Sequence, residues 1–322
     1  MEEALKNFAQ QFAWKPIIEH EDALPRERRS VVLCGMGGSH LAADILKMVR
    51  PETDIYIHRD YGLPALDDAK YSTALHIASS HSGNTEEVLD FVSEALKRGR
   101  SVAVISSGGA LIDVARTHSL PYVLLPDGGI QPRVAIGHAL VALGALLGDT
   151  PLLQELGRLA VEWKPSEIEA EGKALAWKMQ GKIPLVYASR ARSALAMNWK
   201  IRFNETAKIP AFHNVFPELN HNEMEGFDLM NQMEMSTNIF HFIFLFDKND
   251  HPRISRRMII TRKLLEARGY TVSVVESAEK NPWINAFHLL LLADWTAVHI
   301  AQENDVDPEQ VPMISELKEK LS

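Results

Sequence analysis

The stretch SVVLCGMGGSHLAADILKMV, residues 30–49, decides the fold, because it predicts a strand, a tight turn and a helix in direct succession. Val31–Cys34 is an apolar run typical of a buried strand, and apolar residues recur at helical spacing over 41–49. Between them, Gly35, Gly37 and Gly38 allow backbone N–H groups to approach a ligand closely, next to the positive end of the helix. The turn therefore predicts an anion site. It has neither the Gly-Lys-Ser/Thr ending of a P-loop nor the spacing G-x-G-x-x-G, so a nucleotide is not required.

A second loop of this kind is SHSGNT, residues 80–85, which follows a predicted strand at 75–79 and precedes a predicted helix. Its hydroxyl residues Ser80, Ser82 and Thr85 are also common helix caps, so a purely structural role is the alternative. Parallel strands end at one edge of their sheet, and open α/β sheets bind ligands at that edge. Together with the hydroxyl of Ser39, we expect this loop to surround one phosphate group from two sides.

Strand and helix patterns alternate through both halves of the chain. Further strands are predicted at 54–58, 102–105, 122–125, 183–188, 239–246 and 271–275, and further helices within 1–20 and at 111–115, 134–147, 166–180, 194–203, 252–268 and 282–302. This alternation predicts an α/β protein with two doubly wound, mainly parallel-sheet domains. Prolines and a change of element around 148–165 place the domains at residues 1–152 and 153–322.

The second half repeats the first strand–loop–helix unit weakly. The strand 183–188 is followed by the loop SRARS and a helix, but Arg190 and Arg192 stand where the first copy has glycines. We therefore expect only the first copy to keep the phosphate cradle.

The composition is that of an ordinary soluble globular chain of 322 residues, with 46% hydrophobic and 24% charged residues. A formal net charge of -8 without a basic stripe argues against nucleic acid or an anionic membrane as the main partner. The N-terminus is acidic, unlike a signal peptide, and charged or polar residues interrupt the apolar helix 282–302, which we interpret as a core or interface helix. We expect a cytoplasmic protein whose single cysteine, Cys34, is a small buried hydrophobe.

The segment PDGGIQPR, residues 126–133, is a third candidate for ligand contact. Gly128 and Gly129 free its backbone, and Pro132 is expected to start the following helix. Arg133 then lies in the first helical turn, where the helix dipole disfavours a cation, and this conflict points to a ligand-facing role. A solvated arginine is the alternative.

The stretch FNETAKIPAFHNVFPELNHNEMEG, residues 203–226, gathers seven ionisable residues among aromatic and apolar ones. Pro210 and Pro217 prevent one long helix. Three phenylalanines predict that part of the stretch packs against the protein and holds its ionisable groups in fixed places, which suits acid–base chemistry. A charged, solvated connection is the alternative. Because neither H-x-x-x-H nor H-E-x-x-H spacing occurs, we predict no metal site.

Taken together, GMGGS, SHSGNT, the GxxPR element and the stretch 203–226 resemble the sugar isomerase (SIS) fold. More narrowly, they resemble the bifunctional phosphoglucose/phosphomannose isomerase family, and the resemblance covers nearly the full chain in the same order. It implies an aldose–ketose isomerase without metal or cofactor that interconverts glucose 6-phosphate and fructose 6-phosphate, with mannose 6-phosphate as a second candidate substrate. It also implies a homodimer in which the catalytic histidine reaches the active site from the partner subunit.

By position, the resemblance assigns the catalytic base to Glu205, the ring-opening histidine to His221 and the enediolate-stabilising arginine to Arg133. It assigns a C-terminal ring-opening lysine to Lys318, with Lys320 as the alternative. The phosphate contacts of the family fall on Gly37, Gly38, Ser39, Ser80, Ser82 and Thr85.

These residue types suit the implied reaction. One carboxylate can carry a proton from C2 to C1 of the sugar through a cis-enediolate, and a guanidinium already in position can stabilise the enediolate charge. An imidazole exchanges protons near neutral pH, as opening of the sugar ring requires. Two alternatives stay open: a non-catalytic SIS module that senses a sugar phosphate, and an isomerase of another phosphosugar, such as an amino sugar or a heptulose.

Overall fold

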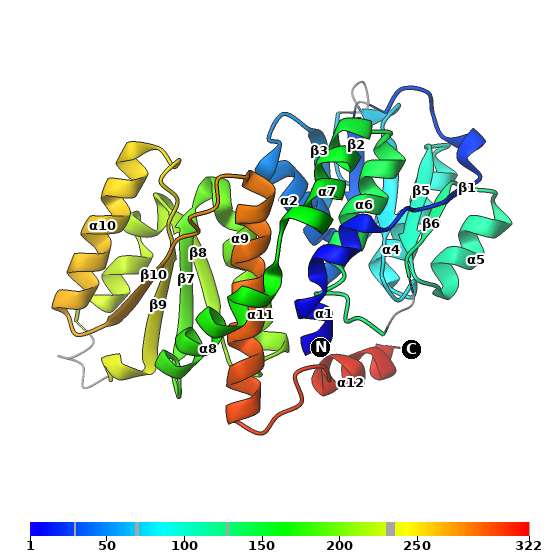
Figure 1. The fold of residues 1–322 in the computed structure, drawn as a ribbon. Coiled ribbons are helices and arrows are strands. Elements are labelled where there is room, and N and C mark those ends of the chain that lie inside the picture. Colours follow the sequence, from blue (N-terminus) through cyan, green and yellow to red (C-terminus); the bar gives the residue numbers. More distant parts are fainter. Residues whose placement is uncertain (29, 68–70, 127–128, 230–235, 322) are drawn as a thin grey trace. The chain divides into compact units, whose positions relative to one another are not determined.

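The computed structural model describes residues 1–28, 30–67, 71–126, 129–229 and 236–321 (Figure 1). The chain divides into two compact units: Lys6–Lys164 is called the first unit here, and Pro165–Ser322 together with Met1–Leu5 the second. The first unit extends beyond the expected end at residue 152, because α7 (Thr150–Glu162) packs against α6 (Ile136–Leu147) and the 3₁₀ helix Phe8–Ala13.

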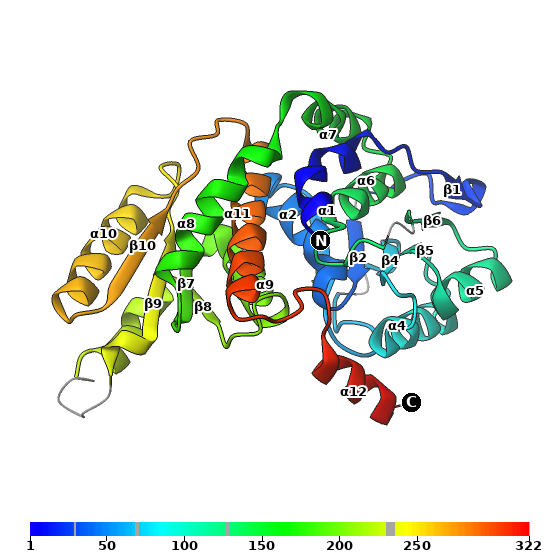
Figure 2. The same cartoon turned by 60° about the horizontal axis from the view of Figure 1, so that its bottom comes forward.

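The first unit is built on a six-stranded sheet in the order β1-β6-β5-β4-β2-β3, in which only the edge pair β1–β6 is antiparallel. Helices α2 and α6 cover one face of this sheet, and α4 and α5 cover the other (Figures 1 and 2). The strands are β1 (Ile18–Glu19), β2 (Ser30–Cys34), β3 (Asp54–His58), β4 (Leu75–Ser79), β5 (Val102–Ser106) and β6 (Tyr122–Leu124). The helices not yet given are α2 (Leu41–Val49), α4 (Glu86–Lys97) and α5 (Gly109–Thr117).

The strand order of the first unit reverses direction around β2. From β2 the chain moves to β3 on one side, and it then returns to β4 on the other side of β2. The loops after β2 and β4 therefore leave the carboxyl edge in opposite directions and open a crevice, the usual ligand site of such sheets. The two glycine- and hydroxyl-rich loops predicted from the sequence are these two loops.

The second unit contains a four-stranded parallel sheet in the order β10-β9-β7-β8. Helix α10 covers one face, and α8, α9 and α11 lie on the other (Figures 1 and 2). Aromatic rings of Tyr187, Phe216, Phe242 and Phe244 fill the core on the α10 side. The strands are β7 (Ile183–Ser189), β8 (Phe212–Phe216), β9 (Phe240–Leu245) and β10 (Thr271–Val275), and the helices are α8 (Ile168–Lys178), α9 (Ser193–Glu205), α10 (Pro252–Ala267), α11 (Pro282–Glu303) and α12 (Pro312–Leu321).

Helix α11 is the core helix of the second unit. Among the described residues it is the one helix long and apolar enough to cross a membrane, and 94% of its most apolar stretch is buried inside the protein. It packs against α8 and α9, and its Asp294 forms a buried ion pair with Arg202 of α9. The interpretation as a core helix is therefore confirmed.

The predicted class, an α/β protein with mainly parallel sheets, is confirmed. Two local expectations differ from the structure. The N-terminal segment forms the short helix α1 (Glu2–Lys6) and a separate 3₁₀ helix at Phe8–Ala13. The stretch 203–226 contributes β8, an edge strand that pairs with β7.

Candidate active site

The loop after β2 is shaped by close backbone contacts. Gly37 has a φ of +53°, in the left-handed region, and starts a 3₁₀ turn that leads into α2. A Cβ added to Gly38 would lie 3.1 Å from the backbone nitrogen of Arg133, so a side chain there would push against the turn that carries this arginine. The structure thus places the loop after β2 against the turn that carries Arg133. This contact could not be predicted from the sequence.

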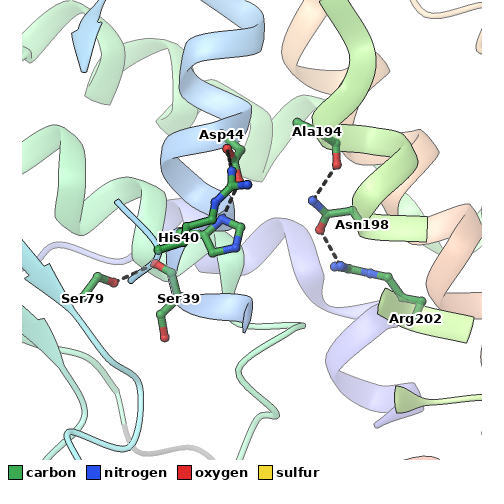
Figure 3. A network of polar contacts seen from close by, with 8 residues as sticks. Ser39, His40, Asp44, Ser79, Ala194, Asn198 and Arg202 are labelled. Carbon is green, nitrogen blue, oxygen red and sulfur yellow. Dashed lines mark hydrogen bonds and ion pairs between the residues drawn. The ribbon is translucent and has the colours of Figure 1, made fainter. Parts of the chain in front are cut away.

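Hydrogen bonds join the loops after β2 and β4. The hydroxyl of Ser79 donates to the carbonyl oxygen of Ser39 at 2.8 Å (Figure 3). The backbone N–H of His81 donates to the hydroxyl of Ser39 at 3.1 Å. Ser39, in the loop after β2, is therefore held by the end of β4 and by the loop that follows β4. This is the arrangement expected of two loops that surround one phosphate group.

The hydroxyl groups of the loop SHSGNT point to one another and to its backbone. Ser80 and Thr85 share a hydrogen bond of 2.7 Å, and the N–H groups of Gly83 and Asn84 donate to the hydroxyls of Ser80 and Ser82. Thr85 occupies the N-cap position of α4, but its side chain makes no capping hydrogen bond. The capping alternative therefore does not account for Thr85. Ser80 and Ser82 do stabilise the turn through their hydroxyls.

Arg133 lies in a position different from the predicted one. Helix α6 begins at Ile136, and Arg133 belongs to the turn before it, so the predicted place in the first helical turn is wrong. The solvated alternative is wrong as well, because Arg133 is only 3% exposed. Arg133 is buried and its backbone lies against the loop after β2, a setting that suits a role in charge stabilisation. Gly128, the other predicted feature of this segment, lies outside the described residues.

A buried histidine next to the first loop was not predicted. His40 donates from Nδ1 to Asp44 at 2.5 Å, one helical turn later, and Arg59 donates to the other oxygen of Asp44 at 2.6 Å (Figure 3). His40 and Asp44 are 4% and 9% exposed. In the sequence, the spacing of four residues between His40 and Asp44 is the feature that could have predicted this contact. The group fixes the residue that follows Ser39 and thereby the end of the phosphate loop.

In the second unit, Glu205 is the last residue of α9 and is partly buried. Its backbone oxygen accepts a hydrogen bond from the ammonium group of Lys208, which has a left-handed φ of +58°. One turn earlier, Arg202 donates to Asn198 at 2.5 Å (Figure 3). Arg202 also donates to Asp294 of α11 at 3.1 Å. The helix that presents Glu205 is therefore anchored in the core.

His221 lies on the surface of the second unit, in the 3₁₀ helix Glu218–His221 that follows β8. The segment around it is fixed from both sides. Glu223 accepts hydrogen bonds from Tyr187 of β7 and Asn214 of β8, and Asn220 donates to Thr261 of α10 at 2.8 Å. Burial and the bond to Glu223 raise the pKa of Tyr187, which keeps this phenol protonated. The predicted packing of this stretch is therefore present, and a loose, solvated connection does not describe it.

The two candidate lysines lie on α12, where both are exposed. Lys320 forms an ion pair with Glu316 at 2.6 Å. Within the part of the chain that the structure describes, Lys318 has no such pair. In that same part, no group of three or more His, Cys, Asp or Glu side chains could hold a metal ion.

The first unit thus carries the six residues predicted to bind phosphate and Arg133, and the second carries Glu205, His221 and the candidate lysines. Residues 168–321 match the family model of the bacterial phospho-glucose isomerase C-terminal SIS domain. Over its full length, the chain is 33% identical to a bifunctional phosphoglucose/phosphomannose isomerase of Aquifex aeolicus, 99% of which is covered. A protein of the same name from Caldicellulosiruptor bescii is 32% identical, over 91% of this chain and 89% of that one.

The chain belongs to the bifunctional phosphoglucose/phosphomannose isomerase family. Solved structures agree on the fold of this family member. A hypothetical protein of Thermus thermophilus superimposes with a TM-score of 0.70 at 16% identity, over 99% of this chain and 86% of that one. The C-terminal domain of glucosamine-fructose-6-phosphate aminotransferase from Francisella tularensis gives 0.67 at 13% identity, over 96% of both chains. The predicted resemblance to the family is confirmed.

Proposed function

We propose that this chain is an isomerase that interconverts glucose 6-phosphate and mannose 6-phosphate with fructose 6-phosphate. The observation that carries the proposal is the pair of joined loops at the carboxyl edge of β2 and β4, in a chain whose full-length relatives bear the name of this activity. The loops offer glycine backbone and hydroxyl groups, which suit a phosphate monoester. The six residues assigned to it are Gly37, Gly38, Ser39, Ser80, Ser82 and Thr85.

The proton transfer is assigned to Glu205. Its carboxylate removes the proton from C2 of the open-chain aldose and delivers a proton to C1 of the cis-enediolate, which yields the ketose without any change in overall composition. The anchoring of α9 through Arg202 supports this role, since a proton shuttle has to be held in a fixed place. The buried guanidinium of Arg133 is assigned to the negative charge of the enediolate.

Ring opening is assigned to His221 and Lys318. The surface position of His221 in its own unit suits a histidine that serves the active site of a partner subunit, so we include a homodimer in the proposal. Lys318 is preferred over Lys320 because the latter is paired with Glu316. The proposal also includes a cytoplasmic location and catalysis without a metal or cofactor.

The test is a comparison of Glu205→Gln with the parent chain in coupled assays of glucose 6-phosphate and mannose 6-phosphate, with a chelator present. Loss of the base should lower kcat by about 10²–10⁴-fold for both aldoses, while binding of fructose 6-phosphate persists. The matched control is Glu225→Gln, an exposed glutamate of the same stretch with the same chemical change. An unchanged kcat in Glu205→Gln would remove the catalytic assignment. Absence of turnover of both aldoses by the parent chain, with another phosphosugar turned over instead, would remove the substrate assignment.

A further inference from the structure

We propose that the second unit carries a second sugar-phosphate site, at the carboxyl edge of its own sheet beside β9. The strands β7, β8, β9 and β10 repeat the succession of β2, β3, β4 and β5: from β7 the chain moves to β8 on one side and returns to β9 on the other. The loops after β7 and β9 therefore border a crevice of the kind that follows β2 and β4 in the first unit. The crevice after β7 has no part in the proposed isomerase mechanism.

Side chains fill the bottom of this second crevice, where the first unit has glycines. Arg192 pairs with Asp247 and donates to Asn285 at 2.9 Å, and burial lowers the pKa of its guanidinium. The hydroxyl of Ser189, at the end of β7, donates to Asp250 of the loop after β9 at 2.7 Å. The two loops are thus joined as in the first unit, but the carboxylate of Asp247 occupies the guanidinium that a phosphate would use. A ligand has to bind beside this pair.

A pocket of about 640 Å³ lies there, between the loop after β9 and the first turns of α10. Its polar lining consists of Lys248, Asp250, Ser255 and Arg256. Two cations, a hydroxyl and the positive end of a 16-residue helix at one mouth favour a phosphate group. The volume is in the range of small-molecule sites.

The remaining lining fits the sugar rather than the phosphate. The oxygen Oδ2 of Asp250 is buried and has no hydrogen-bond partner among the described residues. Burial also raises the pKa of this carboxyl, partly offset by its bond to Ser189 and the charge of Arg192. The carboxylate of Asp250 lines the pocket, so a sugar hydroxyl bound there can donate to it. Ile259 and Ile260 add apolar surface, which suits the C–H face of a sugar ring.

The charge around the pocket favours an anion as well. The chain as a whole has a formal net charge of -8, yet the segment 252–267 that forms α10 contains five Arg or Lys residues and one Glu. Such a local excess of positive charge raises the concentration of small anions near the helix. A phosphorylated sugar therefore matches the pocket in charge, in hydrogen bonding and in apolar contact.

The experiment is a titration of the full chain with fructose 6-phosphate, followed by NMR of isotopically labelled isoleucine methyl groups. Ile259 and Ile260 line the proposed site and report on it separately from the phosphate loops of the first unit. We expect their signals to shift in a saturable way, with a dissociation constant of their own. In Arg256→Gln this constant should rise by about tenfold, as expected from loss of one charged hydrogen bond. Inorganic phosphate should shift the same signals more weakly, because it offers no sugar hydroxyl to Asp250.

The matched control is Arg262→Gln, on the same helix but outside the pocket, where the arginine pairs with Glu266. It makes the same change in charge and should leave the dissociation constant within about twofold of the parent value. Asp250→Asn tests the sugar end and should weaken fructose 6-phosphate more than inorganic phosphate. The proposal is overturned if the two isoleucine signals do not saturate, or if Arg256→Gln and Arg262→Gln weaken binding equally. Because these signals report binding in the second unit and not a rate of turnover, the result does not depend on whether Glu205 is the catalytic base.

Discussion

Breaking the buried ion pair between Arg202 and Asp294 is the sharpest test of how α9 presents Glu205. Both residues are at most 1% exposed, and their side chains meet at 3.1 Å between α9 and α11. In Asp294→Leu the guanidinium stays buried without its counter-charge, which costs about 3–5 kcal/mol. Replacing both partners, in Arg202→Met/Asp294→Leu, removes the buried charge altogether and should bring the stability back to within about 1 kcal/mol of the parent chain.

The assay is urea unfolding followed by tryptophan fluorescence. Trp199 on α9 and Trp295 on α11 are both fully buried, so unfolding of the helices that carry the pair contributes to the fluorescence change of the six tryptophans. With a urea dependence of about 3 kcal/mol per M, the single variant should shift the midpoint of the second unit down by about 1–2 M. Because Glu205 follows Arg202 by less than one helical turn, kcat should fall in the single variant and recover in the double variant.

The control is Glu266→Gln, which breaks the exposed pair with Arg262 on α10 and should cost less than about 0.5 kcal/mol. If the double variant proves as unstable as Asp294→Leu alone, the loss comes from packing or from the bond between Arg202 and Asn198, and the electrostatic reasoning fails. A midpoint shift no larger than that of the control would refute it too.

Three further outcomes follow from single contacts. Gly38→Ala places a Cβ 3.1 Å from the backbone nitrogen of Arg133, so kcat/KM should fall at least about tenfold with an unchanged circular dichroism spectrum; equal activity would show that the turn yields easily. Burial lowers the pKa of His241 to about 4, so the stability that the neutral ring provides is full above pH 6.5 and is lost as pH falls toward 4. His241→Asn should therefore reduce the loss of urea stability between pH 7 and pH 4, by up to about 3 kcal/mol. Lys318→Met should slow turnover more than Lys320→Met, and the reverse order of rates would move the role to the paired lysine.

The sequence predicted most of the fold because its buried parallel strands are continuous apolar runs. The strand at 102–105, for example, is buried at every position and consists of apolar residues alone, so its pattern needs no tertiary information. Edge elements carry no such signal. Strand β8 is exposed at Phe212 and His213, so its residues looked like a connection, and only the pairing with β7 makes it a strand.

The features of the candidate site likewise divide into those that the sequence could predict and those that it could not. The residue types of the loops were visible in the sequence, since glycines and hydroxyls between a strand and a helix have a local meaning. The contact of Gly38 with the turn of Arg133 joins segments far apart in the sequence, and it depends on the way α2 and the 3₁₀ turn before it pack against α6. The bond between Tyr187 and Glu223 depends likewise on the pairing of strands and has no local pattern.

The two crevices explain why one topology can yield two different sites. In the first unit, a Cβ at Gly37 would meet no atom within 4 Å, and we assign this open space at the carboxyl end of β2, near Ser39, to phosphate oxygens. In the second, Arg192 reaches the equivalent place and is neutralised by Asp247 of the same unit. The carboxylate of Asp247 thus neutralises Arg192 in place of a phosphate group. We therefore place the ligand of the second unit beside the basic N-terminal end of α10. The side chains of two loops, rather than the strand order that both sheets share, decide which anion each crevice accepts.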